Sequence, residues 1–385
     1  MFALVGNIRR KRTLYGAHPI THKITIIINS LILFIGAAAA LWLIILRNNH
    51  TKIKAMVKPN FTQINTDELL KRFRRAATGN PNDARDFFTH LPFVIDYSKK
   101  DYLSAFNSAI YILTELKEFD NQAYERIHKG YIFYFMAISA FMMHDYQAAT
   151  FFFDITAAED MKNSPGVRTP PLLFLVLDGE NPEQAAQELT ANAEKWFETM
   201  IGKYNDISGS VVLTLDEVRQ LFLERAITDH QEWRTLVTSW ISFYLEWNHR
   251  IHILNLRIED GTWEPFYLHL FKGCLLFESL LKSEPSGQVT EQTLGQILNN
   301  QNSYSRSRIG ITRRINTGSA TFTDIVSESK SALPGIENDI EVTARLRNTV
   351  GHNLGLSASI NLDEFNYLAN KVSSSCLHAV STLYR

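Results

Sequence analysis

Apolar side chains recur at helical spacing along most of the chain. From Asp67 to the C-terminus, nearly every segment places apolar residues at intervals of three and four, which mark one face of a helix rather than an alternating strand. Helix-start signals accompany this spacing. Thr214 with Glu217, and Asn361 with Glu364, both have the form of a capping box. We therefore expect an all-α protein.

The longest apolar stretch precedes this helical body. Residues 24–46 carry no charge in 23 positions, which is long enough to cross a bilayer as a helix. We predict a transmembrane helix there, preceded by a basic leader at 1–23 and followed by a linker at 47–66. Five Lys or Arg precede the span and four follow it, so the positive-inside preference barely distinguishes its two orientations. The alternative is a cytoplasmic protein that starts at Met56.

Charge is unevenly distributed between the leader and the body. The whole chain has a net charge of -1, but residues 1–66 contain nine Lys or Arg and no acid. Subtracting these nine from the 39 basic residues leaves 30 against 40 acidic residues in the body. An acidic body argues against broad affinity for nucleic acids. Because Cys274 and Cys376 are the only cysteines, a disulfide scaffold and Cys-rich zinc modules are excluded.

A weak repeat occurs in the first half of the body. The pair Asp101-Tyr102 reappears 44 residues later as Asp145-Tyr146, each time after a polar break. It resembles the start of the second helix in tetratricopeptide-like hairpins, although their period is roughly 34 residues. We expect residues 67–229 to form helical hairpins that serve binding or dimerisation, with an ordinary helical core as the alternative.

The candidate chemistry lies near the C-terminus, where Arg347, Asn348 and His352 follow the order R-N-x3-H. On a helix, Asn348 and His352 lie one turn apart on one face. Histidine can exchange a proton with a 2′-hydroxyl or a leaving oxygen near neutral pH. Arginine can bind a phosphate through two N–H groups, and an amide can orient either partner. Gly351 lies inside the same helix, which predicts a close approach at that position.

Two further R-x4-H matches occur at Arg85–His90 and Arg225–His230. Leu91-Pro92 follows the first of these and breaks the helix that such a motif needs. A pattern this loose recurs by chance, so the sequence around each match has to distinguish them. No glycine-rich phosphate loop, GxSxG or HExxH is present. We therefore expect neither a metal nor a cofactor.

The context of the third match is distinctive. Upstream, the apolar segment Tyr267–Ser283 ends in the pair Glu278-x3-Lys282, and downstream Asn361–Leu383 forms an amphipathic helix. A helix with this pair, a polar insert, a helix with R-N-x3-H and a closing helix together resemble a C-terminal HEPN domain. The resemblance covers about residues 230–385 and implies a helical bundle.

The resemblance to HEPN proteins also implies an activity. Members occur as prokaryotic toxins and defence ribonucleases, and residues from two subunits meet across a symmetric dimer. They cleave RNA without metal and leave a 2′,3′-cyclic phosphate and a 5′-hydroxyl. The resemblance therefore implies that Arg347 binds phosphate, His352 acts as acid and base, and Asn348 orients them, with Glu278 and Lys282 in supporting roles.

The same resemblance implies partners and a cellular setting. We expect a homodimer whose substrate is RNA, held back by an antitoxin or sensor partner in a toxin or antiphage defence system. A ribonuclease has to meet RNA in the cytoplasm, so a protein anchored through residues 24–46 would keep its body there. The alternative is a non-catalytic helical binding or scaffold protein, also anchored in the membrane if the leader is translated.

An insert at about 284–339 separates the two HEPN-like helices. Its segment 301–314 contains no acid. Arginines combined with an aromatic side chain can bind phosphates and stack on unpaired bases. The residues that we expect to contact RNA are Tyr304, Arg306, Arg308, Arg313 and Arg314. A solvated flexible loop is the alternative.

Overall fold

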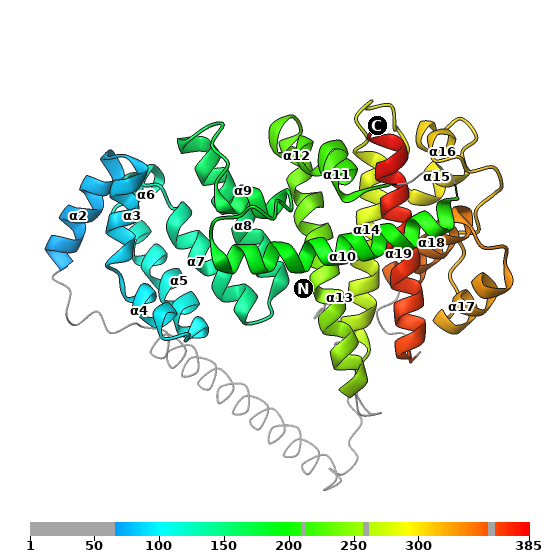
Figure 1. Ribbon diagram of the computed structural model, residues 1–385, viewed down its shortest axis with the longest axis horizontal. Helices are drawn as coiled ribbons and strands as arrows, with labels where there is room; N and C mark the ends of the chain where they lie inside the picture. Colours follow the sequence, from blue (N-terminus) through cyan, green and yellow to red (C-terminus); the bar gives the residue numbers. More distant parts are fainter. Residues whose placement is uncertain (1–65, 210–212, 257–261, 353–358) are drawn as a thin grey trace, which may run out of the picture. The chain divides into compact units, whose positions relative to one another are not determined.

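The computed structural model describes residues 66–209, 213–256, 262–352 and 359–385. The chain divides after Pro59 into two compact units, and all of the described residues belong to the second. These residues form helices and no strand (Figure 1), which confirms the all-α prediction. Residues 24–46, where a transmembrane helix is predicted, lie outside the described ranges. Of the helices that are described, none has the length and apolar character needed to cross a bilayer.

The helices follow one another with short connections. In chain order they are α2 (Thr66–Thr78), α3 (Pro81–Thr89), α4 (Pro92–Ser98), α5 (Tyr102–Phe119), α6 (Asn121–Arg126), α7 (Gly130–Met142), α8 (Tyr146–Asn163), α9 (Pro170–Leu175), α10 (Gln184–Ser208), α11 (Leu215–Val218), α12 (Arg225–Thr228), α13 (Arg234–Leu256), α14 (Glu264–Lys282), α15 (Leu294–Asn299), α16 (Tyr304–Arg308), α17 (Phe322–Ser331), α18 (Ile336–His352) and α19 (Leu362–Leu383). Both predicted capping boxes are present, at the starts of α11 and α19. Single turns at Arg219–Leu223 and Gln231–Trp233 complete the set.

Two hydrophobic cores hold the described unit together. The smaller core is built from α2 to α7, and the larger core takes in the helices from α7 to α19. Helix α7 contributes to both, because Ile132 and Met136 belong to the smaller core and Ala137 and Ile138 to the larger. In Figure 1, α2 to α6 lie at one end of this unit, and α15 to α18 lie at the other.

Helix α10 ties the predicted helical-hairpin region to the C-terminal bundle. The Trp196 ring lies 5.4 Å from that of Trp247 on α13, and the Phe197 ring lies 5.2 Å from that of Trp240. α10 also packs against α19. The larger core therefore runs continuously across residue 230, where the sequence pattern placed a boundary between domains.

The C-terminal bundle consists of α13, α14, α18 and α19. Helix α14 packs against all three of the others. At Gly273 on α14, an added Cβ would lie 2.6 Å from Val372 Cγ1 on α19 and 2.7 Å from Phe243 Cε2 on α13. Both distances are too short for a real carbon contact. The absence of a side chain at this position therefore lets three helices approach one another closely.

The Asp-Tyr repeat marks two equivalent helix starts. Helices α5 and α8 are both 18 residues long. The Asp101 carboxylate accepts the N–H of Ser104 at 3.1 Å, and the Asp145 carboxylate accepts that of Ala148 at 3.0 Å. Each is an N-cap that satisfies a free donor of the first turn. The likeness to tetratricopeptide hairpins stays a prediction.

The residue before each of these caps has a left-handed backbone. The φ angle is 62° at Lys100 and 61° at His144, and Leu177 adopts 56° at a third helix end. In each case the next amide donates back to a carbonyl of the preceding helix, for example Asp101 N to Asp96 O at 3.1 Å. This is the Schellman type of helix ending, where glycine is favoured because it has no Cβ.

Lys100→Gly is therefore expected to stabilise the protein by about 0.5–1 kcal/mol, because Lys in this conformation carries steric strain that exceeds the extra chain entropy of glycine. Urea unfolding measures the change. Lys99→Gly is the matched control, because Lys99 has a right-handed backbone with φ -83° and gains nothing from glycine. A loss of stability in Lys100→Gly equal to that in the control would contradict this account.

Candidate functional site

Helix α18 carries the R-N-x3-H motif along its last two turns. Its first turn contains Glu337 and Asp339, which suit the positive end of the helix dipole. Its apolar side packs against α14 and α19. The helix ends at His352, whose side chain lies outside the described part of the structure. The role of His352 therefore stays a prediction, while Arg347 and Asn348 can be examined directly.

The carboxylate of Glu278 joins both predicted pairs. Its Oε2 accepts the Arg347 Nε–H at 2.9 Å, and its Oε1 accepts from Lys282 Nζ at 2.7 Å. The Glu278 side chain is only 6% exposed, whereas those of Arg347 and Lys282 are 26% and 35% exposed. The structure thus brings together the two residues predicted to support the motif and the arginine of the motif itself.

The electrostatics of this cluster leave an excess of positive charge. Burial by itself would raise the pKa of the Glu278 carboxyl, but hydrogen bonds and charges from Lys282 and Arg347 lower it below its usual value. The carboxylate is therefore ionised at neutral pH. One carboxylate between two cations leaves a net charge of +1. A partly exposed cluster of this charge favours an anion such as a phosphate group.

Asn348 contacts both the insert and the arginine of the motif. Its Nδ2 donates to the backbone oxygen of Thr317 at 2.6 Å, and its Oδ1 lies 3.4 Å from Arg347 Nη1. Thr317 could not be singled out from the residue pattern, because its contact is made by a backbone carbonyl group, which every residue has. The segment around Thr317 therefore forms one wall of the site.

Gly351 lies close to an aromatic ring of α14. A Cβ at Gly351 would lie 3.0 Å from Phe271 Cε2, and Arg347 Nη1 is 3.9 Å from the same point. The glycine inside this helix predicts a close approach at this position. The close neighbour in the structure is a side chain of the same subunit.

The guanidinium of Arg306 does not face solvent, which corrects its prediction as an RNA contact. The residue is 8% exposed. Its Nη1 donates to the carbonyl oxygen of Leu298, and its Nη2 donates to that of Arg313 at 2.9 Å. In a helix of five residues, spacing alone does not determine which side chains turn inward. Arg306 instead fastens the two halves of the insert to each other.

The other four residues that we predicted to contact RNA differ in whether their side chains are free to bind a ligand. Arg313 is ion-paired with Glu337 at 3.3 Å, and Tyr304 packs against the larger core. Arg308 and Arg314 are exposed. Neither of these two side chains forms an ion pair or hydrogen bond within the described ranges. They are the members of the set best placed to meet a ligand.

The contrast between two arginines of α16 can be tested by stability. Arg306→Ala is expected to lower the free energy of unfolding by about 2–3 kcal/mol, because it leaves the carbonyl groups of Leu298 and Arg313, one buried and one partly buried, without these donors. Arg308→Ala is expected to change it by less than about 0.5 kcal/mol, since that side chain is on the surface. Chemical denaturation measures both. Equal losses in the two variants would refute the assigned structural role.

The two other R-x4-H matches have structural neighbours. His230 stacks on Trp233 with ring centroids 3.9 Å apart, and the Arg225 guanidinium lies 5.5 Å from the same ring. His90 caps the end of α3, and its Nδ1 lies 2.6 Å from the carbonyl oxygen of Asp86. These contacts account for both histidines within their own local structure.

Comparisons of the chain with family models, with curated proteins and with solved structures find no match. Function therefore has to be inferred from the chemistry of the cluster on α14 and α18.

Proposed function

We propose that this protein is a metal-independent endoribonuclease of the HEPN type. The observation that carries the proposal is the contact between α14 and α18, in which Glu278 lies 2.9 Å from Arg347 and 2.7 Å from Lys282. A buried carboxylate that fixes one edge of a guanidinium leaves its other N–H groups for a phosphate. Arg347 is then the phosphate-binding group, and Glu278 is its positioning residue.

The proposed reaction is an attack of a ribose 2′-hydroxyl on the adjacent phosphorus. His352 takes the hydroxyl proton or returns a proton to the departing 5′-oxygen, as its neutral pKa range allows. Arg347 stabilises the added negative charge on the pentacoordinate phosphorus. The P–O5′ bond breaks, which yields a 2′,3′-cyclic phosphate and a 5′-hydroxyl. The reaction needs one group that accepts a proton and one that donates a proton. Two subunits together supply two copies of His352, one for each role, so we propose a homodimer.

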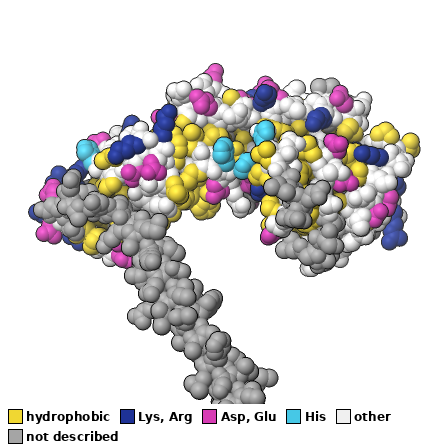
Figure 2. Space-filling view, turned by 90° about the horizontal axis from the view of Figure 1, so that it is seen from below, with side chains coloured by type: hydrophobic (Ala, Val, Ile, Leu, Met, Phe, Trp, Pro, Cys, Tyr) yellow, Lys and Arg dark blue, Asp and Glu magenta, His cyan; other side chains and the backbone are white. Residues whose placement is uncertain are grey.

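The distribution of charge on the surface supports RNA binding at one small area of the protein. On the face seen in Figure 2, Lys and Arg side chains are scattered among Asp and Glu instead of forming one basic surface. The body is acidic overall, with 40 acidic residues against 30 basic ones. Binding of RNA then depends on Arg347 with the exposed Arg308 and Arg314. Such a protein would bind nucleic acid weakly except near the site.

The proposed setting is a prokaryotic toxin or antiphage defence system. An antitoxin or sensor partner would hold the activity back, and the helical hairpins around α5 and α8 offer a scaffold for it. The body has to be cytoplasmic in either case, whether the chain is anchored through residues 24–46 or starts at Met56.

The experiment that tests this proposal is RNA cleavage by the purified full-length protein and by residues 56–385. Both are assayed in EDTA beside His352→Ala, with circular dichroism to verify folding. We expect EDTA-resistant cleavage that leaves cyclic phosphate ends and is lost in the variant. Cleavage that survives His352→Ala, or that EDTA abolishes, would contradict the proposal.

A second candidate is a non-catalytic binding or scaffold protein. The observation that favours it is the engagement of Arg347 by Glu278 within one subunit, since structural ion pairs also perturb carboxylate pKa values. If a folded dimer cleaves none of several RNAs, expression in cells distinguishes the two candidates. Toxicity of the wild type but not of His352→Ala supports the enzyme, and equal growth of both supports the scaffold.

A further inference from the structure

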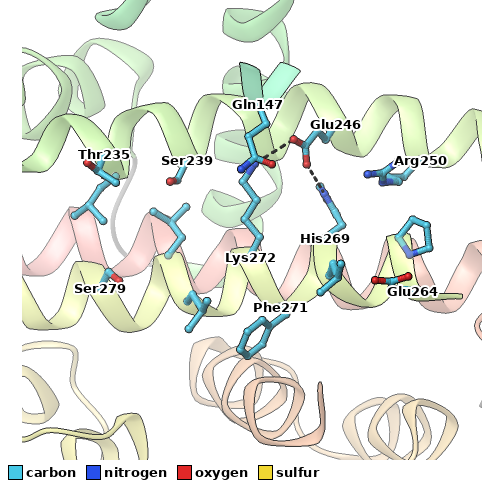
Figure 3. A pocket seen from close by; sticks show the side chains of 15 residues that line it. Gln147, Thr235, Ser239, Glu246, Arg250, Glu264, His269, Phe271, Lys272 and Ser279 are labelled. Atoms are coloured by element: carbon cyan, nitrogen blue, oxygen red, sulfur yellow. Dashed lines mark hydrogen bonds and ion pairs between the residues drawn. The ribbon is translucent and has the colours of Figure 1, made fainter. Parts of the chain in front are cut away.

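A groove lies between α13 and α14, where one turn of α8 also reaches it (Figure 3). Its volume is about 660 Å³, within the range of roughly 300–1,000 Å³ that is typical of small-molecule sites. One wall is apolar and includes Leu268 and Phe271 of α14. Gln147 of α8 and Ser239 of α13 add an amide and a hydroxyl to the lining. This lining combines apolar surface with convergent polar groups.

Two buried polar atoms beside this groove have no partner in the described structure. They are Arg250 Nε and His269 Nε2, whereas His269 Nδ1 faces the carboxylate of Glu246. The His269 side chain is fully buried and stacks on Phe243 with ring centroids 4.4 Å apart. Leaving such groups unsatisfied is unfavourable, and most buried polar groups in proteins have partners. Their grouping at one concave site indicates that a ligand completes it.

Two acidic and two basic side chains line the groove, and one acidic and one basic side chain among them form an ion pair. Glu246 pairs with Lys272 at 3.1 Å, and its other oxygen lies 3.6 Å from His269 Nδ1. Burial lowers the pKa of His269 to about 4, so the ring is neutral at pH 7. Arg250 lines the groove and forms no ion pair with any described residue, while Glu264 at the rim is exposed to water. The interior of the groove therefore has one unpaired guanidinium.

We propose that this groove binds a small phosphorylated ligand of mononucleotide size, with its phosphate on Arg250. A guanidinium matches phosphate oxygens through two N–H groups. Lys272 on the facing helix is already paired with Glu246, so Arg250 is the group that carries the charge for the ligand. The ring of the ligand lies against the apolar wall at Leu268 and Phe271. Gln147 and Ser239 supply hydrogen bonds to its polar edge or sugar.

The proposal is tested by calorimetric titration of the full-length protein with each of the four ribonucleoside 5′-monophosphates. Inorganic phosphate and the four nucleosides are titrated separately. We expect saturable binding of at least one monophosphate, at least tenfold tighter than that of phosphate or of its nucleoside. Arg250→Gln should weaken this binding by about tenfold or more, because a charge-assisted contact is lost.

Two further variants locate the ligand. Ser239→Phe fills the groove without altering its charges and should weaken binding by a similar factor. Arg75→Gln removes an exposed arginine of α2 and should leave the affinity within twofold. Circular dichroism melting verifies that each variant is folded. Because the readout is binding, the result does not depend on any ribonuclease activity.

Three results would overturn the proposal. The first is that none of the monophosphates binds saturably to the wild type. The second is binding that Arg250→Gln and Ser239→Phe leave unchanged. The third is binding that is lost in Arg347→Gln instead, which would place the ligand at the cluster on α18.

Discussion

Arg347→Ala is expected to reduce RNA cleavage by about 100-fold to 1,000-fold, the loss seen when a donor that stabilises transition-state charge is removed. The physical reason is the geometry of the guanidinium. Glu278 engages its Nε at 2.9 Å, which fixes its plane and leaves other N–H groups for phosphate oxygens. The measurement is the single-turnover rate with a short RNA in EDTA.

Arg347→Lys sharpens this test, because lysine retains the charge but cannot form the two-pronged contact. We expect its rate to lie between those of the alanine variant and the wild type. Arg308→Ala is the control for the loss of an exposed positive charge outside the cluster and should affect affinity more than rate. If Arg347→Ala cleaves RNA within about threefold of the wild type, Arg347 has no part in the reaction.

Gly273→Ala is expected to lower the free energy of unfolding by about 2–3 kcal/mol. Its new methyl group would lie 2.6 Å from Val372 and 2.7 Å from Phe243, so α14 would have to move away from α19 or α13. This loss exceeds the gain of roughly 1 kcal/mol that alanine gives over glycine inside a helix. Chemical denaturation followed by tryptophan fluorescence measures the change, because Trp240 and Trp247 belong to the same core.

Gly202→Ala is the matched control, since Gly202 also lies inside a long helix but has no atom within 4 Å of an added Cβ. It is expected to raise stability by about 0.5–1 kcal/mol. If Gly→Ala lowers the free energy of unfolding at Gly273 and raises it at Gly202, the difference isolates the effect of packing. Stabilisation by Gly273→Ala would show that the three helices are less tightly packed than described.

The local features of the fold could be predicted from the sequence because they depend on neighbours in the chain. The capping boxes at Thr214 and Asn361 were identified from residue type and spacing alone, and the Asp-Tyr repeat marked the starts of α5 and α8. The role of α10 was not, since its packing on Trp240 and Trp247 depends on residues 40 or more positions away. Apolar periodicity shows that a face is buried, but it does not name the helix that covers it.

The candidate site likewise depends on contacts between residues that are distant in the chain, which the sequence pattern does not reveal. The contact between Glu278 and Arg347 joins residues 69 positions apart, and it was anticipated only through the resemblance to HEPN proteins. Arg306 and Arg308 look alike in sequence, yet one is buried and the other exposed. Nothing in the apolar pattern of α14 indicated that His269 would be enclosed beside Lys272. Side-chain direction in short helices and pairing between distant helices require the folded structure.

The two hydrophobic cores have a consequence for cooperativity. The two cores have only α7 and the residues packed around it in common. The smaller core can therefore unfold while the larger one stays folded. Separate cooperative units of a protein behave in this way in native-state hydrogen exchange. Thermal melting should then follow two transitions, and one midpoint would not describe the protein. Lys100→Gly would shift the midpoint of the first transition, and Gly273→Ala would shift that of the second. A partner that binds the N-terminal helices would therefore unfold or stabilise them without disturbing the bundle that carries Arg347.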